Sequence, residues 1–108
     1  MPMSGWARLA FRFRLMSYNL EFLPSAQKEW RKVGATVREQ LKKKLKARMD
    51  APRVPASKLS GHTDRYKIKL RKSGYRLVYE VVDDRLVILV IAIGKRNREA
   101  VYEKAAKR

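Results

Sequence analysis

The chain has 108 residues, 45% of them apolar, and carries 27 lysines and arginines against 10 aspartates and glutamates, a formal net charge of +17. This length fits one domain with a modest core, and the charge favours a polyanionic partner, foremost a nucleic acid. The absence of cysteine excludes disulfides and thiolate chemistry. His62 is the one histidine and lies in a loop-like stretch without neighbouring ligands, which is typical of a solvated side chain.

Residues 1–15 are interpreted as an extension that precedes a domain spanning 16–108. The stretch MPMSGWARLAFRFRL contains arginines among its apolar residues, so it lacks the apolar core of a signal peptide. An alternative is that the alternation of Phe11, Phe13 and Leu15 with arginines extends the first strand. No apolar run approaches the roughly 20 residues of a transmembrane helix. We therefore expect a cytoplasmic protein that does not contact a membrane.

The domain is expected to begin with a strand and a helix. Apolar residues alternate with polar ones over 17–23, which predicts a short strand. Ser25 is the expected N-cap of the following helix, and Gly34 fits the position just after its end. The helix has an apolar stripe at Ala26, Trp30 and Val33.

A second helix is expected to follow and to form a helical hairpin with the first. Thr36 and Glu39 have the spacing of a capping box, and an apolar residue recurs every fourth position, at Val37, Leu41, Leu45 and Met49. Its other faces carry Lys42, Lys43, Lys44 and Lys46. Such a run is usually solvated surface, but its density also suits a phosphate backbone. The Pro-rich loop that follows has Val54 and Leu59 as expected anchors.

The stretch RYKIKLRKSGYRLVYEVV over 65–82 predicts a β-hairpin. A two-residue turn at Ser73-Gly74 would pair three apolar residues on one face, Leu70 with Leu77, Ile68 with Tyr79 and Tyr66 with Val81. The same register would place on the other face Arg71 opposite Arg76, Lys69 opposite Val78 and Lys67 opposite Glu80. Like charges that face each other across strands are unfavourable, so we expect an anionic ligand to supply the countercharge.

After a turn at Asp83-Asp84, residues 85–94 are apolar at nearly every position, which predicts a central strand covered on both faces. Lys95, Arg96 and Arg98 follow, and a terminal helix is expected over 97–107. The expected topology lets the side chains of Lys67, Lys69, Arg76 and Arg96 converge on one concavity.

Cationic side chains of this kind can cleave RNA, because the ribose 2′-OH serves as the nucleophile. Arginine is always protonated and can bind phosphate through two hydrogen bonds. Lysine among other cations has a lowered pKa and can act as an acid or base near neutrality. The sequence has no Cys/His pair, HExxH, Walker loop or metal-ligand cluster. Spacing alone nevertheless favours a non-catalytic RNA-binding surface over a nuclease.

Four stretches of the chain, some of them described above, carry a resemblance to a known family: KEWRKVGATVREQLKKKL, KLSG, YKIKLRKSGYRLVYEVVD and IGKRNREAVY. Together they resemble the RelE toxins of bacterial toxin–antitoxin pairs, from about Met16 to Arg108. The resemblance implies the compact α+β fold of that family: an N-terminal strand, a helical hairpin, a three-stranded antiparallel sheet and a C-terminal helix. It also implies a ribosome-dependent endoribonuclease that cuts mRNA in the A site, leaves a 2′,3′-cyclic phosphate and needs no metal or cofactor.

By the same resemblance, the functional residues are Lys67, Lys69, Arg76, Arg96 and Tyr102. Arg76 and Arg96 would hold the scissile phosphate, and the two lysines would serve proton transfer and electrostatics. Which group is the general acid and which the general base stays open. Tyr102 would stack on or orient the mRNA. Binding of ribosomal RNA would fall to Lys42, Lys43, Lys44, Lys46, Arg71, Lys72 and Arg98.

The resemblance further implies a RelB-like antitoxin that covers the cationic face or displaces the terminal helix, and operator DNA as a partner only of the toxin–antitoxin complex. Two alternatives remain. One is a toxin of the same fold that inhibits DNA gyrase, although such relatives lack the Lys/Arg/Tyr set. The other is a non-enzymatic module that binds ribosomes or RNA. The residues 1–15 depart from the family pattern.

Overall fold

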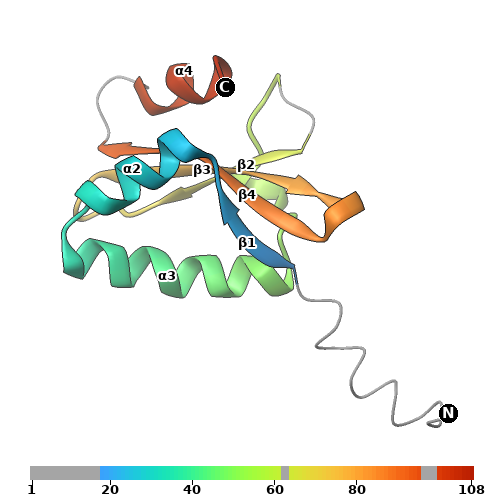
Figure 1. Ribbon diagram of the computed structural model, residues 1–108, viewed down its shortest axis with the longest axis horizontal. Helices are drawn as coiled ribbons and strands as arrows, with labels where there is room; N and C mark the ends of the chain where they lie inside the picture. Colours follow the sequence, from blue (N-terminus) through green and yellow to red (C-terminus); the bar gives the residue numbers. More distant parts are fainter. Residues whose placement is uncertain (1–17, 62–63, 96–99) are drawn as a thin grey trace, which may run out of the picture.

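The computed structural model describes residues 18–61, 64–95 and 100–108, and it confirms the expected α+β architecture (Figure 1). The strands are β1 (Asn19–Phe22), β2 (Arg65–Lys69), β3 (Tyr75–Val82) and β4 (Val87–Lys95), and the helices are α2 (Pro24–Lys32), α3 (Ala35–Asp50) and α4 (Ala100–Ala106). Two short 3₁₀ turns, η1 (Pro55–Ser57) and η2 (Asp83–Arg85), join them. The sequence's expectations for residues 1–15 lie outside the described residues.

All four strands form one sheet in the order β1-β4-β3-β2. The three strands of the C-terminal half pair antiparallel as expected, but β1 joins the edge of β4 in parallel, so the sheet is mixed. Figure 1 shows α3 on one side of this sheet and α4 on the other. The sheet therefore has two covered faces.

Each face has its own apolar cluster. The larger cluster packs Ala26 of α2 and Leu41 and Leu45 of α3 against residues of the sheet that include Ile68 and Tyr79. The smaller packs Val101 and Ala105 of α4 against Val78, Ile91 and Ala92. We call the side of the sheet under α4 the α4 face. The expected apolar stripes of the two long helices are confirmed, with Trp30, Val37 and Met49 partly buried at the margins.

A register shift interrupts the regular alternation of β4 between the two faces of the sheet. Val78 pairs with Ala92 but Tyr79 pairs with Val90, so Ile91 is an additional residue in β4. The shift lets Val90 and Ile93 contribute to the larger cluster while Ile91 and Ala92 contribute to the smaller. A bulge of this kind increases local twist. The expectation of a central strand covered on both faces is confirmed.

The expected hairpin register is wrong by two residues. Tyr66 pairs with Tyr79, Lys67 with Val78 and Lys69 with Arg76, while Arg65 pairs with Glu80. The chain reverses over 71–74, closed by a hydrogen bond from the Leu70 N–H to the Tyr75 carbonyl at 2.9 Å. The predicted two-residue turn at Ser73-Gly74 is two residues shorter than the observed loop, which has four residues and ends at Gly74 with φ +79°. A slip of two residues leaves every side chain on its expected face.

The expected helix caps are also wrong. The helix α2 begins at Pro24 with Leu23 at the N-cap, and α3 begins at Ala35 with Gly34 at the N-cap, both without a side-chain capping bond. Gly34 has φ −63° and begins the second helix rather than ending the first. Proline at the first helical position needs no N–H partner, which explains why Ser25 is not the cap.

The terminal helix is confirmed over Ala100–Ala106, one residue short of its expected end, and its expected first residues, 97–99, lie outside the described residues. It packs closely on the end of β4, since a Cβ added to Gly94 would lie 2.9 Å from Val101 Cγ2. Gly94 was expected to end the strand, which extends one residue further. None of the described helices has the length and apolar character needed to cross a membrane.

Candidate active site

Three of the predicted site residues lie together on the α4 face at the loop end of the β2–β3 hairpin. Lys69 and Arg76 are direct cross-strand partners, and Lys67 precedes Lys69 by two positions on the same face. The like-charge pair that the sequence placed at Arg71 and Arg76 is therefore Lys69 and Arg76. We call Lys67, Lys69 and Arg76 the cationic cluster.

Arg76 is a buried cation without a carboxylate. It is 9% exposed, and its guanidinium donates to the backbone carbonyl of Tyr75 at 3.2 Å. Among the described residues, no carboxylate lies within ion-pair distance of it or of Lys67 or Lys69. Burial of an unpaired charge is costly, so the fold holds this guanidinium at a cost in stability.

The electrostatics of the cluster alter a titration. Lys69 is exposed, yet the charge of Lys67, some loss of hydration, and the charges of Arg76 and Arg71 together lower the pKa of its ammonium from the ordinary value. Crowding by like charge disfavours the protonated form. Lys69 consequently gives up a proton more readily than an isolated lysine does.

Tyr102 reaches the same face from α4. Its ring is partly buried and packs against the cluster that contains Val78, the cross-strand partner of Lys67. A partly buried ring at this position is compatible with a role in the core as well as with the expected contact with mRNA. Among the described residues Lys67 forms no ion pair with Glu80, which instead accepts from Arg65 at 2.9 Å.

The comparisons with known proteins agree on one family. The chain matches, over residues 20–100, the family model described as the ParE toxin of the type II toxin–antitoxin system parDE. It is 59% identical over 93 residues to the mRNA interferase toxin RelE of Escherichia coli K12, covering 86% of this chain and 98% of the relative.

The chain belongs to the ParE/RelE family of type II toxins. Solved structures agree. A mutant of E. coli RelE in the free state superposes with a TM-score of 0.79 at 56% identity, covering 85% of this toxin and 97% of that chain. RelE from the intact E. coli RelBE toxin–antitoxin complex gives 0.73 at 58% identity, covering 76% of this toxin and all of that chain, 100%. The expected family is confirmed.

Two predicted residues of the toxin, Arg96 and Arg98, lie outside the described residues. The strand β4 ends at Lys95, the cross-strand partner of Tyr75, and the Lys95 ammonium lies 5.8 Å from the centroid of the Tyr75 ring. This end of β4 is next to Arg76 in the sheet, since Arg76 pairs with Gly94.

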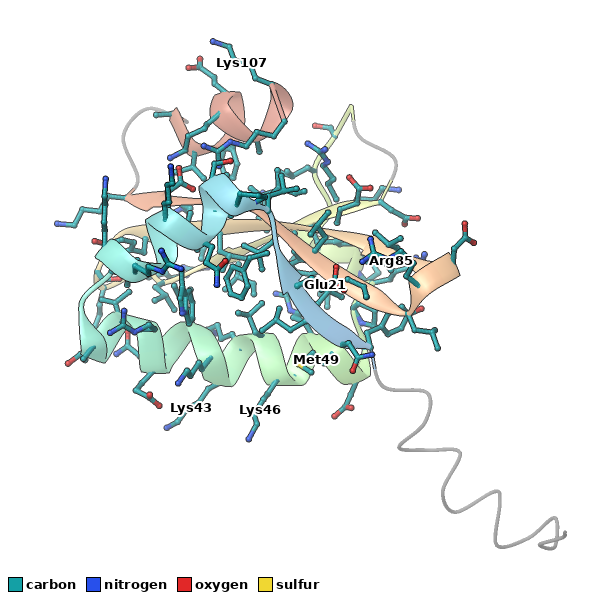
Figure 2. The ribbon with its side chains drawn as sticks, in the orientation of Figure 1. Glu21, Lys43, Lys46, Met49, Arg85 and Lys107 are labelled. Carbon is teal, nitrogen blue, oxygen red and sulfur yellow. The ribbon has the colours of Figure 1, made fainter. Side chains whose placement is uncertain are left out.

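The lysines of α3 are on a separate surface of the toxin. They are exposed, and Figure 2 shows Lys43 and Lys46 pointing away from the sheet. Lys42 lies 3.4 Å from Glu39 one turn earlier. Arg71 and Lys72 are exposed in the hairpin loop beside the cationic cluster. The predicted RNA-binding residues thus divide into a group near the cluster and a group on the outer side of α3.

Sequence reasoning missed Arg48. It lies on α3 and donates from Nη1 to the Tyr79 hydroxyl at 2.8 Å and to the Lys67 carbonyl at 3.3 Å. The signal was its position seven residues after Leu41 and three after Leu45, which places it at the margin of the buried stripe. Among the described residues, no group of three or more His, Asp or Glu side chains is arranged to hold a metal ion.

Proposed function

We propose that this toxin is an endoribonuclease that cleaves mRNA in the ribosomal A site and so arrests translation. The observation that carries the proposal is the cationic cluster itself: Lys67, Lys69 and Arg76 lie together on one face, and in the described part of the chain none of them forms an ion pair with a carboxylate. The support from relatives is the 59% identity to a protein named an mRNA interferase toxin. The reaction is the attack of a ribose 2′-OH on the adjacent phosphorus, which expels the 5′-oxygen and leaves a 2′,3′-cyclic phosphate.

The guanidinium of Arg76 binds the scissile phosphate. In the transition state, negative charge grows on the nonbridging oxygens, and a preorganised donor stabilises that charge without reorganisation. The backbone bond to Tyr75 and the burial of the side chain fix its position before RNA binds. By family resemblance, Arg96 is the second arginine on this phosphate.

The two lysines provide charge and proton transfer. The 2′-OH must lose a proton and the departing 5′-oxygen must gain one, so a group that exchanges protons near neutrality is useful. The pKa of Lys69 is lowered from its ordinary value, the direction that favours this task. The charge of Lys67 is the largest cause of that shift, so Lys67 contributes through its electrostatic field. Tyr102, on the same α4 face, orients the mRNA.

Docking on the ribosome falls to the cations outside the cluster: Lys42, Lys43, Lys44, Lys46, Arg71, Lys72 and Arg98. Contacts between such side chains and ribosomal RNA phosphates supply affinity without reading sequence. Free mRNA offers few of these contacts, which accounts for ribosome dependence. The site of action is accordingly the cytoplasm.

The toxin's second partner is a RelB-like antitoxin, which binds the cationic face or displaces α4. One solved relative is E. coli RelE with a peptide of the antitoxin RelB, at a TM-score of 0.73. Operator DNA is bound by the pair, with most DNA contacts made by the antitoxin.

Primer extension on mRNA from a translating extract tests this proposal. The expected result is cuts within A-site codons with 2′,3′-cyclic phosphate ends, abolished in Arg76→Ala. Intact mRNA together with blocked translation would instead show a non-enzymatic ribosome binder. Broken chromosomal DNA would show a gyrase poison. The presence of Lys67, Lys69, Arg76, Arg96 and Tyr102 in the sequence argues against that last outcome, since gyrase-directed relatives lack the set.

A further inference from the structure

A hollow of about 310 Å³ lies along the outer edge of β2, between the sheet and the η1 turn. It is lined by Arg48, Ala56, Ser57, Lys67, Lys69 and Arg71. Four of these six side chains are cationic and none is acidic. The two lysines are members of the cationic cluster, so the hollow opens directly beside the candidate active site.

Arg48 is held in this hollow by neutral acceptors. Its guanidinium donates to the Tyr79 hydroxyl at 2.8 Å, to the Ser57 hydroxyl at 3.2 Å and to the Lys67 carbonyl at 3.3 Å. Its Cζ also lies 5.6 Å from the centroid of the Tyr79 ring. Tyr79 in turn donates to the Pro52 carbonyl at 2.6 Å. The side chain is thus fixed from three directions.

Arg48 keeps free donors within the part of the chain that the structure describes. A guanidinium has five N–H groups, and the three bonds use three of them. Among the described residues, no carboxylate lies within ion-pair distance of Arg48. A positioned cation with free donors and no countercharge is what a site for an anion requires.

We propose that this hollow binds a backbone phosphate of the mRNA next to the one that is cut, with Arg48 as its principal ligand and Ser57 as the residue that positions Arg48. The inference rests on the proposed function, because it assigns the strand to be cleaved. The substrate strand is favoured over ribosomal RNA because Lys67 and Lys69 line both the hollow and the active site. A strand whose phosphate is bound at Arg76 therefore passes this edge of β2.

The first test measures binding without cleavage. The full-length toxin is titrated with a short RNA in which every 2′-OH is methylated, and affinity is followed by fluorescence anisotropy over a range of salt concentrations. Arg48→Gln is expected to weaken binding about tenfold and to reduce the slope of log K against log salt by about 0.7, the value for one phosphate on a single strand. Arg48→Lys is expected to keep most of the slope, because it retains the charge.

Arg31→Gln is the matched control. Arg31 is exposed near the end of α2 and lies outside the hollow, yet the substitution removes the same group and the same charge. Equal losses in Arg48→Gln and Arg31→Gln would overturn the proposal. Thermal denaturation of each variant keeps a folding defect distinct from a binding defect, and Ser57→Ala gives a second, milder perturbation of the same guanidinium.

The second test identifies the strand. Ribosomes are programmed with mRNAs in which single phosphates near the cut are replaced by neutral methylphosphonates. One replacement is expected to slow the wild-type toxin about tenfold and to have no further effect in Arg48→Gln. The proposal would be overturned in favour of ribosomal RNA by a different result. In that result the rate losses from Arg48→Gln and from each methylphosphonate would multiply at every position, and the variant would bind ribosomes more weakly on every mRNA. If the wild-type toxin cuts nothing, the proposed function fails, whereas the binding test still decides the role of Arg48.

Discussion

The two ends of the β2–β3 hairpin treat their cations in opposite ways. At the open end, Arg65 binds Glu80 at 2.9 Å and donates to the Ala105 carbonyl of α4 at 2.7 Å. At the loop end, Lys69 directly faces Arg76, and the described residues offer neither of them a carboxylate. The same two strands thus carry one compensated and one uncompensated set of charges.

The compensated set continues through α4. Lys104 and Arg108 both bind Glu29 of α2, at 2.7 and 3.0 Å, and Glu29 also accepts the Ile93 N–H at 3.0 Å. These contacts fix α4 on the sheet. The difference shows that carboxylates accompany the cations that stabilise the fold. Because the described residues place no carboxylate beside Lys69 and Arg76, we interpret these two cations as groups that bind a ligand.

The largest predicted effect is on catalysis. Arg76→Gln is expected to reduce the rate of mRNA cleavage on programmed ribosomes by about 10²–10³-fold, the usual cost of losing one transition-state donor. The free energy of unfolding should change little or increase, because the substitution removes a buried charge without a partner. A large loss of stability in urea denaturation would mean that Arg76 is structural.

The second effect is on stability. Glu29→Gln is expected to lower the free energy of unfolding by about 2 kcal/mol, because it weakens charge-assisted bonds to Lys104 and Arg108. Burial raises the pKa of Glu29, but the bonds from Arg108, Lys104 and the Ile93 N–H outweigh it and hold the pKa below its ordinary 4.5. The stabilisation is therefore present above pH 4.5 and is lost as the pH falls below it.

Glu21→Gln is the control for that measurement. Glu21 binds Arg85 on the surface (Figure 2), where both side chains are largely exposed. Urea denaturation at neutral pH should show a loss of at most about 1 kcal/mol for this exposed pair. Equal losses of unfolding free energy in the two variants would contradict the claim that the ion pairs of Glu29 stabilise the fold more than an exposed ion pair does.

The third effect is on a titration. Lys67→Met should raise the pKa of Lys69 towards its ordinary value, since the charge of Lys67 is the largest cause of the lowering. If Lys69 transfers a proton, the limb of the pH–rate profile that reports its ionisation would move to higher pH with it. NMR of the lysine side chains measures the shift directly. An unchanged pKa of Lys69 would show that the charge of Lys67 does not cause the lowering.

The smallest effect concerns docking. Lys43→Gln combined with Lys46→Gln changes a surface that points away from the cationic cluster (Figure 2). Ribosome affinity should fall a few-fold and its salt dependence should weaken, while cleavage in saturated complexes should continue at the wild-type rate. A reduced rate at saturation would show that α3 contributes to the chemistry.

The sequence predicted the helices, the strands and their buried faces better than the hairpin register and the helix caps. Apolar periodicity identified the helices, and a continuous apolar run identified the doubly covered strand, because burial constrains several residues of each element at once. The hairpin register was wrong by two because such a slip keeps both faces intact, so alternation carries no information about it. Helix caps depend on a single residue each, and Leu23 and Gly34 occupy the N-cap positions that the sequence assigned to Ser25 and Thr36.

The candidate site was predicted to a similar extent. Lys67, Lys69 and Arg76 were identified from the hairpin pattern and the family resemblance, and they lie together as expected. Arg48 could not be separated from the other cations of its helix by composition, because only its contacts with β2 and Tyr79 distinguish it.

The central claim is that the cationic cluster lacks a countercharge until an RNA phosphate binds. The most direct measurement is the pKa of Lys69, followed by NMR in the wild-type toxin with and without a 2′-O-methylated RNA. The account predicts a clear rise of this pKa in the complex, because the phosphate offsets the charges of Lys67 and Arg76. An unchanged pKa in a saturated complex would contradict it.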